Sequence, residues 1–145
     1  MSNRVKIPQA DPEAYKALIA LETYINSTAL TKTHKELIKI RASQINGCSY
    51  CIDMHTKDAR KAGETEQRIY ALNAWRETPF FDEQERAILA LTEEVTLITN
   101  KVSDATYNAA AALFDKAYLG QVIMAIVTIN AWNRIGIATG LEPQL

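Results

Sequence analysis

The sequence predicts an all-α protein, a bundle of six or seven helices in a single domain spanning residues 1–145. Apolar residues recur at intervals of three and four, and the helix-favouring residues Ala, Leu, Glu, Lys and Ile dominate the composition. No alternation of apolar and polar residues extends over a useful strand length. A chain of 145 residues without a break in composition has the size of one domain.

The first helix is predicted to follow a short arm. Residues 1–10 carry no helical periodicity, and Asp11 is an expected N-cap with Pro12 in the first helical position. Glu22 is the one polar residue within the apolar stripe of this helix. We therefore expect Glu22 at a solvated or rim position.

The second and third helices are predicted to form a hairpin. The second starts near Thr31 or Thr33, and Thr33-x-x-Glu36 fits a capping box, in which Glu36 bonds the backbone at the helix start. Gly47 can end this helix, and the third is expected over residues 49–62. The short turn at Gly47 makes the two helices fold back against each other.

The remaining helices are each predicted from a cap and a stop signal. In chain order, these are a helix from Thr65 to Thr78-Pro79, a helix from the capping box Asp82-x-x-Glu85 to Asn100, a helix capped by Ser103, and a last helix over residues 119–139 that stops at Gly140. The last helix is apolar nearly all round up to Trp132, so we expect it to be central or pressed against another subunit.

Charge and composition exclude several classes of partner. The net charge of −1 gives no electrostatic reason for a nucleic-acid or membrane-surface partner. No basic segment followed by an apolar run marks a signal peptide, and the most apolar stretch, residues 122–132, is too short to span a bilayer. We therefore expect a cytoplasmic protein. In that compartment, a close cysteine pair is typical of a redox or metal site rather than of a structural disulfide.

The segment 47–55 contains both cysteines and one of the two histidines. Cys48 and Cys51 are three residues apart, and His55 follows Cys51 by four. If a helix starts near Cys48, all three side chains share one face. A dithiol at a helix N-terminus beside a base indicates a reactive thiolate.

His55 is expected to do more than ionise the thiol. About 3% of an ordinary thiol is ionised at pH 7, and lowering its pKa to about 6 gives roughly 30-fold more thiolate. Nucleophilicity falls by about 13-fold over the same range, so the net gain is only about twofold. We therefore expect His55 to move protons, which requires a carboxylate partner. Asp53 lies about 200° around the helix from His55, whereas Glu36 on the preceding helix can face it.

The pattern Glu36-x11-Cys48-x-x-Cys51-x-x-x-His55 resembles the core motif of the carboxymuconolactone decarboxylase superfamily, in its alkylhydroperoxidase D-like branch. Segments 41–48, 74–78 and 130–134 are similar to the flanking segments of that family. The resemblance covers roughly residues 12–140. It implies an all-helical fold and a homo-oligomer, often a trimer or hexamer.

The resemblance also implies roles for the motif residues. Cys51 would be the peroxidatic thiol, which is oxidised to a sulfenic acid, and Cys48 would resolve it by forming the Cys48–Cys51 disulfide. His55 and Glu36 would form the proton relay. A lipoylated protein or a thioredoxin-type dithiol would then reduce the disulfide at Cys48, which is expected to be the more accessible sulfur. Tyr50 departs from the family's best-known member, which has a histidine there, and is either a relay hydroxyl or a packing residue.

The activity predicted by this resemblance is a thiol-dependent peroxidase that acts on organic hydroperoxides or hydrogen peroxide. The thiols carry the chemistry, so we expect neither a cofactor nor a metal. Three alternatives remain: lactone decarboxylation of the gamma-carboxymuconolactone type, a disulfide exchanger or redox sensor, and a zinc-stabilised structural module. In the last, Cys48, Cys51 and His55 would bind zinc with Glu36 or His34. His34 is otherwise expected at the surface.

Overall fold

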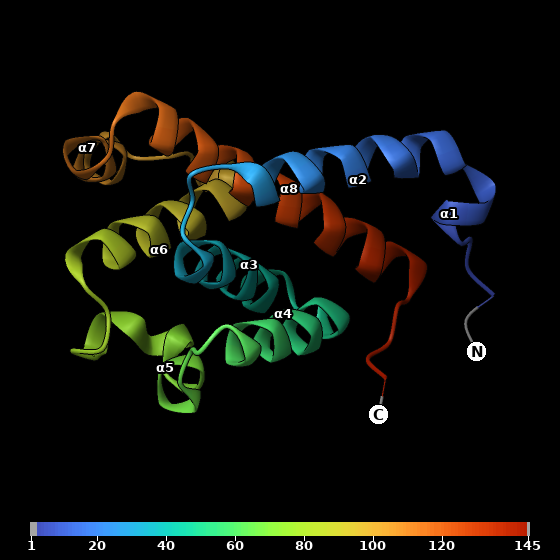
Figure 1. The fold of residues 1–145 in the computed structure, drawn as a ribbon, viewed down its shortest axis with the longest axis horizontal. Coiled ribbons are helices and arrows are strands. Elements are labelled where there is room, and N and C mark those ends of the chain that lie inside the picture. The colour runs from blue at the N-terminus through green and yellow to red at the C-terminus, as the bar shows by residue number, and fades with distance from the viewer. Residues whose placement is uncertain (1–2, 145) are drawn as a thin grey trace.

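The computed structural model describes residues 3–144, and every regular element within them is helical (Figure 1). The α-helices are α1 (Ile7–Ala10), α2 (Pro12–Ser27), α3 (Lys32–Asn46), α4 (Ser49–Lys61), α5 (Glu66–Tyr70), α6 (Glu83–Thr96), α7 (Asp104–Leu113) and α8 (Lys116–Thr139). Two 3-10 segments lie between them: η1 (Leu72–Glu77) between α5 and α6, and η2 (Ile98–Asn100) between α6 and α7. The all-α fold class is confirmed, with α1 as a single turn inside the expected arm. The single domain expected over residues 1–145 stays a prediction.

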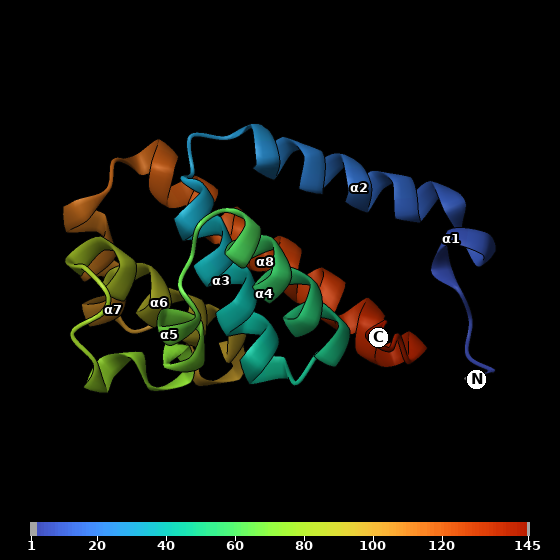
Figure 2. The same cartoon turned by 60° about the horizontal axis from the view of Figure 1, so that its bottom comes forward.

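Helix α3 lies at the centre of the arrangement. It packs against α4, α6 and α8, and α6 packs in turn against α7 and α8. Helix α2 lies along α8 and extends away from the rest of the bundle (Figures 1 and 2). Because only Ile25 of α2 is buried, this helix adds little to the core.

The core has two parts, one on each side of α3 and α6. The larger part joins α3, α6 and α8 through buried aliphatic residues, among them Ile38, Ile88, Leu91, Val122, Ile126 and Ile129. The smaller part joins α3 and α6 to α4, α5 and η1 through Leu37, Ile40, Ala59, Ile69, Leu72, Trp75 and Leu89. Adjacent residues of α3 therefore point into different parts of the core, which holds this helix on several sides.

Glu22 lies at a rim position, as expected, with its side chain 22% exposed. Its carboxylate accepts a hydrogen bond from Lys39 Nζ at 2.7 Å and another from Trp132 Nε1 at 3.1 Å. The Lys39 side chain is only 8% exposed. From this rim position Glu22 neutralises a buried lysine and joins α2 to α3 and α8. A buried ammonium group needs such a partner, because an unpaired charge there is strongly destabilising.

Most of the expected helix ends are confirmed. Asp11 accepts a bond from the backbone N–H of Ala14, and Ser103 accepts one from that of Thr106. Asp82 and Glu85 make both bonds of a capping box.

The helix expected from Thr65 to Thr78 is instead split into α5 and η1. Ala74 has a non-helical conformation, and the Arg86 guanidinium binds the carbonyls of Trp75 and Arg76. These tertiary hydrogen bonds hold the segment outside a continuous α-helix.

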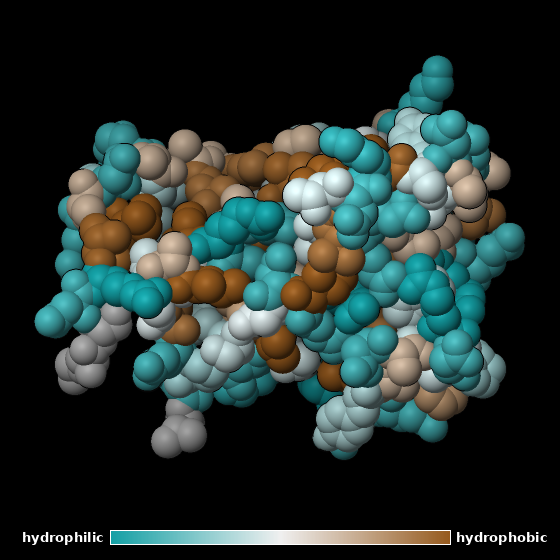
Figure 3. Space-filling model, turned by 180° about the vertical axis from the view of Figure 1, so that it is seen from behind, coloured by the Kyte–Doolittle hydropathy of each residue, from teal (hydrophilic) through white to brown (hydrophobic). Residues whose placement is uncertain are grey.

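The helix α8 has an unusual surface. By length and composition alone it is apolar enough to cross a membrane, a test that the core helix of a soluble protein also meets. One face is buried against the bundle, whereas Met124, Val127 and Ile137 are exposed on the helix. Figure 3 views the molecule from behind and shows hydrophobic side chains exposed between hydrophilic ones.

Candidate active site

The turn between α3 and α4 places the two cysteines. Gly47 ends α3 in the left-handed conformation, at a φ of 71°, which glycine adopts without strain. Cys48 is then the N-cap of α4, and its Sγ accepts a hydrogen bond from the Cys51 N–H at 3.4 Å. The Cα atoms of Cys48 and Cys51 are 5.3 Å apart, and the two residues are joined by a disulfide.

Both sulfur-bearing residues are buried. Cys48 is 2% exposed and Cys51 is 3% exposed, so the expectation that Cys48 is the more accessible one is wrong. Helix α8 lies against the pair, and a Cβ atom added to Gly136 would lie within 4 Å of both sulfur atoms. No motif in the sequence links Gly136 to the cysteines; the available signal is a glycine inside an otherwise apolar helix.

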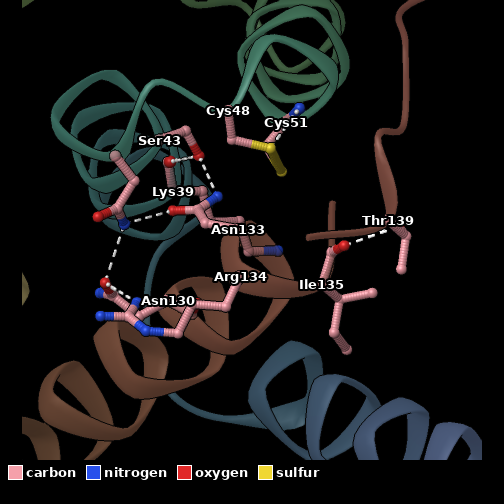
Figure 4. The surroundings of a disulfide bond; sticks show 10 residues. Lys39, Ser43, Cys48, Cys51, Asn130, Asn133, Arg134, Ile135 and Thr139 are labelled. Carbon is pink, nitrogen blue, oxygen red and sulfur yellow. Dashed lines mark hydrogen bonds between the residues drawn. A yellow bond between two sulfur atoms is a disulfide. The ribbon is translucent and has the colours of Figure 1, made fainter. Parts of the chain in front are cut away.

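Polar side chains hold α8 against the turn that carries Cys48 (Figure 4). Asn133 is fully buried, and its Nδ2 donates to Ser43 Oγ at 2.9 Å. Asn46 Nδ2 donates to both Asn133 Oδ1 and Asn130 Oδ1, each at 2.9 Å. The backbone carbonyl of Ser43 in turn accepts the Cys48 N–H at 3.0 Å. These bonds fix the position of Cys48 relative to α8.

His55 and Glu36 face each other across the α3–α4 hairpin. His55 lies one turn after Cys51, and its Nδ1 is 3.4 Å from Glu36 Oε2. The two side chains are 8% and 18% exposed. These two atoms are buried, and neither forms a well-aligned hydrogen bond with any residue described by the structure. The imidazole and the carboxylate therefore keep hydrogen-bonding capacity with which they can accept or deliver a proton.

Glu36 is available for this contact because it does not cap its helix. Thr31 is the N-cap of α3 and accepts the N–H of His34 at 3.1 Å, so the capping box expected from Thr33 to Glu36 is not formed. Glu36 instead borders a cavity of about 10 Å³, enough for about one water molecule. The cavity is lined by Lys32, Thr33, Glu36, Ala59, Ala62 and Glu64.

Three other residues singled out from the sequence lie outside this contact. Tyr50 is partly buried and its hydroxyl makes no hydrogen bond with another residue of the described chain, so its relay role stays a prediction. Asp53 pairs with Lys57 at 2.9 Å, pointing away from His55 as expected. His34 is buried, not at the surface, because Tyr118 on α8 contacts its Nδ1 at 2.6 Å.

The arrangement does not resemble a metal site. Within residues 3–144, no group of three or more His, Cys, Asp or Glu side chains is placed to hold a metal ion. The geometry consists instead of a sulfur pair at a helix N-terminus, backed by an imidazole and a carboxylate. Such a set of groups can exchange electrons through the sulfurs and protons through the imidazole.

Comparison with known proteins finds relatives over the whole chain. The protein is 48% identical to the uncharacterized protein YdfG of Bacillus subtilis over 141 residues, which cover 97% of this chain and 96% of YdfG. The structure matches that of ATU0492 from Agrobacterium tumefaciens with a TM-score of 0.96 and 39% identity, covering 100% of this chain and 99% of that one. ATU0492 is a protein of unknown function for which a role in antioxidant defence, as AhpD, has been suggested.

A more distant structural match shows the breadth of this fold. The debrominase Bmp8 is 18% identical, with a TM-score of 0.84 over 92% of this chain and 73% of its own. The model of the carboxymuconolactone decarboxylase family matches residues 12–94, which include Glu36, both cysteines and His55. With its AhpD-like fold and its CxxC pair, the chain belongs to the carboxymuconolactone decarboxylase family.

Proposed function

We propose that the protein is a thiol-dependent peroxidase, which reduces organic hydroperoxides or hydrogen peroxide while Cys48 and Cys51 cycle between thiols and a disulfide. The observation that carries the proposal is the buried contact of His55 with Glu36, one helical turn behind the Cys48–Cys51 disulfide. The antioxidant role suggested for the relative from Agrobacterium tumefaciens also supports it.

In the first step, Cys51 is the nucleophile. His55 takes the proton of the Cys51 thiol, and the thiolate attacks the terminal oxygen of the hydroperoxide. A sulfur–oxygen bond forms, the oxygen–oxygen bond breaks, and the alkoxide leaves with a proton from His55. Cys51 is then a sulfenic acid and the hydroperoxide has become an alcohol. Glu36 stabilises His55 while it carries the proton, and the small cavity beside Glu36 brings the pair close to solvent.

In the second step, Cys48 resolves the sulfenic acid. Its sulfur attacks the Cys51 sulfur, the disulfide forms, and the hydroxyl leaves as water with the proton of the Cys48 thiol. The N–H of Cys51, which points at Cys48 Sγ, favours the ionised form of the attacking sulfur. The sum of both steps is one hydroperoxide and two thiols converted to one alcohol, one water and one disulfide.

An external dithiol completes the cycle. We propose a lipoylated protein or a thioredoxin-type protein, in which two thiols become a disulfide as Cys48 and Cys51 are reduced. Since both sulfurs are equally buried, accessibility does not decide which is attacked. Attack at Cys48 releases Cys51 as a thiolate near His55, and a stabilised leaving thiolate makes this direction faster.

Two cysteine variants test the proposed roles with cumene hydroperoxide as the probe. Reduced Cys51→Ser should consume no hydroperoxide above the protein-free control. Reduced Cys48→Ser should consume one equivalent and then stop, leaving a sulfenic acid on Cys51 that dimedone labels. Consumption at the original rate by Cys51→Ser would refute the assignment.

Lactone decarboxylation is a second candidate, because the matched family model carries that name and the Glu36–His55 pair does not need sulfur for proton transfer. The double variant Cys48→Ser/Cys51→Ser separates the two functions. Retained decarboxylation of a carboxymuconolactone by this variant would favour the second candidate. If the wild-type protein does not decarboxylate the lactone, the second candidate function is eliminated.

We also propose that the protein acts as a cytoplasmic homo-oligomer, a trimer or a hexamer. The exposed apolar side chains Met124, Val127 and Ile137 on α8 support this assembly, because such residues gain from burial at an interface. Light scattering should give a mass of three or six chains, and Val127→Lys should reduce it. A monomeric wild-type protein at tens of micromolar would contradict this proposal.

A further inference from the structure

Gly136 on α8 stands against the disulfide with no side chain between them. A Cβ atom at this position would lie 3.1 Å from Cys48 Sγ and 3.8 Å from Cys51 Sγ. The shorter distance is less than ordinary van der Waals contact between carbon and sulfur. The backbone of Gly136 is helical and its φ lies outside the left-handed region, so the glycine is needed for space and not for conformation.

Gly120, in the same helix, provides the comparison. A Cβ atom there would meet nothing within 4 Å. Glycine in a helix interior is less favourable than alanine at both positions. Of these two positions, only Gly136 combines the lower helix propensity of glycine with the close approach of a cysteine sulfur.

Helix α8 cannot easily move away from Cys48. Asn133, one turn before Gly136, bonds to Ser43 and Asn46, which lie just before the cysteine turn (Figure 4). Moving α8 outward would break these buried hydrogen bonds. A side chain at position 136 would therefore press on the sulfur instead of displacing the helix.

The two redox forms place the Cys48 sulfur differently. Bonded sulfur atoms lie about 2.05 Å apart, whereas two unbonded sulfurs separate to van der Waals contact, roughly 3.5 Å or more. Cys51 lies within the first turn of α4, while Cys48 is the N-cap with an extended backbone, at a φ of −81° and a ψ of 94°. The disulfide therefore holds the Cys48 sulfur in the place beside Gly136, whereas the free thiol of Cys48 can turn away about its Cα–Cβ bond.

We propose that Gly136 is a positioning residue for the redox cycle, because its bare backbone leaves the space that the Cys48 sulfur occupies in the disulfide form. The inference rests on the part of the proposed function in which Cys48 and Cys51 interconvert between thiols and a disulfide. It does not depend on which oxidant drives that change. A methyl group at position 136 crowds the disulfide form and shifts the equilibrium toward the dithiol.

The test equilibrates the protein with mixtures of reduced and oxidised dithiothreitol, in which two protein thiols pass two electrons and two protons to the oxidised reagent. Alkylation and mass measurement give the fraction in each form. Gly136→Ala should lower the equilibrium constant for disulfide formation about tenfold, and Gly120→Ala should leave it within twofold. An unchanged constant for Gly136→Ala, or a shift toward the disulfide, would overturn the proposal. The experiment contains no peroxide, so a failed peroxidase assay leaves its result standing.

A second comparison identifies the atom responsible. In the oxidised protein, Gly136→Ala should lower the Tm by several degrees, whereas in the Cys48→Ala background it should raise the Tm, as Gly120→Ala does. If Gly136→Ala does not fold alone, the double variant with Cys48→Ala should fold. An equal loss of stability with and without the Cys48 sulfur, or failure of both variants to fold, would show that the contact is not with sulfur and would refute the proposal.

Discussion

Glu36 and Glu93 are both largely buried, but their carboxylates differ in the number of hydrogen bonds that they accept. Glu93, on α6, accepts hydrogen bonds from Arg41 Nε at 2.9 Å, from Trp75 Nε1 at 2.8 Å and from Arg76. Glu36 Oε2 lies 3.4 Å from His55 Nδ1 and forms no hydrogen bond with any residue from 3 to 144. A carboxylate whose hydrogen-bonding capacity is filled, here called saturated, joins helices. A carboxylate with unfilled capacity beside an imidazole, here called unsaturated, can still accept or deliver a proton.

The largest expected effect is on activity, at the unsaturated pair. Glu36→Gln removes the charge that supports a protonated His55, so the rate of hydroperoxide reduction should fall about 100-fold. Its Tm should change little, because no well-formed hydrogen bond is lost. Steady-state kinetics and thermal unfolding of the same preparation check this. A large loss of Tm with unchanged activity would show that Glu36 stabilises the fold, as Glu93 does, and takes no part in proton transfer.

The matching change at the saturated carboxylate should affect stability. Burial alone would raise the pKa of Glu93, but the bonds from Arg76, Trp75 and Arg41 outweigh it and hold this pKa below its ordinary value. Glu93→Gln should lower the free energy of unfolding by about 2 kcal/mol at pH 7 and leave the activity per folded molecule unchanged.

The same carboxylate sets a pH dependence. A depressed folded-state pKa stabilises the protein above the ordinary pKa of a glutamate, about 4.3, and this contribution disappears as the pH falls through the lower folded-state value. Chemical unfolding at a series of pH values should therefore show the difference between wild type and Glu93→Gln shrinking below about pH 4. A constant difference down to pH 3 would contradict the role given to the Glu93 charge.

A smaller effect on stability is expected at the N-cap of α3, where Thr31 and Thr33 can be compared. Thr31→Ala should cost about 1 kcal/mol of stability because Thr31 accepts the N–H of His34. Thr33→Ala is the matched control and should have an effect within about 0.5 kcal/mol, since exposed residues without such contacts contribute little. The reverse order in denaturant unfolding would restore the capping box of Thr33 and Glu36, and would remove Glu36 from the site.

The smallest expected effect is the pH response of His34. Burial lowers the pKa of His34, while the charges of Glu85 and Asp82 act weakly in the opposite direction. The unfolded chain therefore binds more protons, so stability falls as the pH drops through about 6.5 and towards the lower folded-state value. His34→Gln should reduce the loss of Tm between pH 7.5 and 5. An identical pH dependence in both proteins would exclude His34 as its source.

Local signals predicted much of this structure. The caps at Asp11, Asp82 and Ser103 and the stop at Gly140 each depend on neighbours within a few residues, and each is found as expected. The spacing of Cys48, Cys51 and His55 follows equally from helix geometry, and the start of α4 at Ser49 puts the cysteines at its N-terminus.

What the sequence could not predict depends mostly on distant partners. Glu22 bonds to Lys39 and Trp132, and His34 is buried by Tyr118, so both contacts depend on helices that the local pattern cannot orient. Gly136 meets Cys48 across a sequence distance that no periodicity bridges. Glu36 was expected to face His55 because the hairpin turn is short, a case in which local geometry does reach a tertiary contact.

The central claim is that a hydroperoxide oxidises the Cys48–Cys51 pair directly, and thiol counting under anaerobic conditions tests it most directly. Reduced protein is mixed with half an equivalent of cumene hydroperoxide, and the free thiols and the remaining peroxide are measured together over time. The account predicts that two thiols disappear for each hydroperoxide consumed and that a Cys48–Cys51 disulfide is recovered by mass. Hydroperoxide that disappears while both thiols remain, or thiols that survive with the hydroperoxide intact, would contradict it.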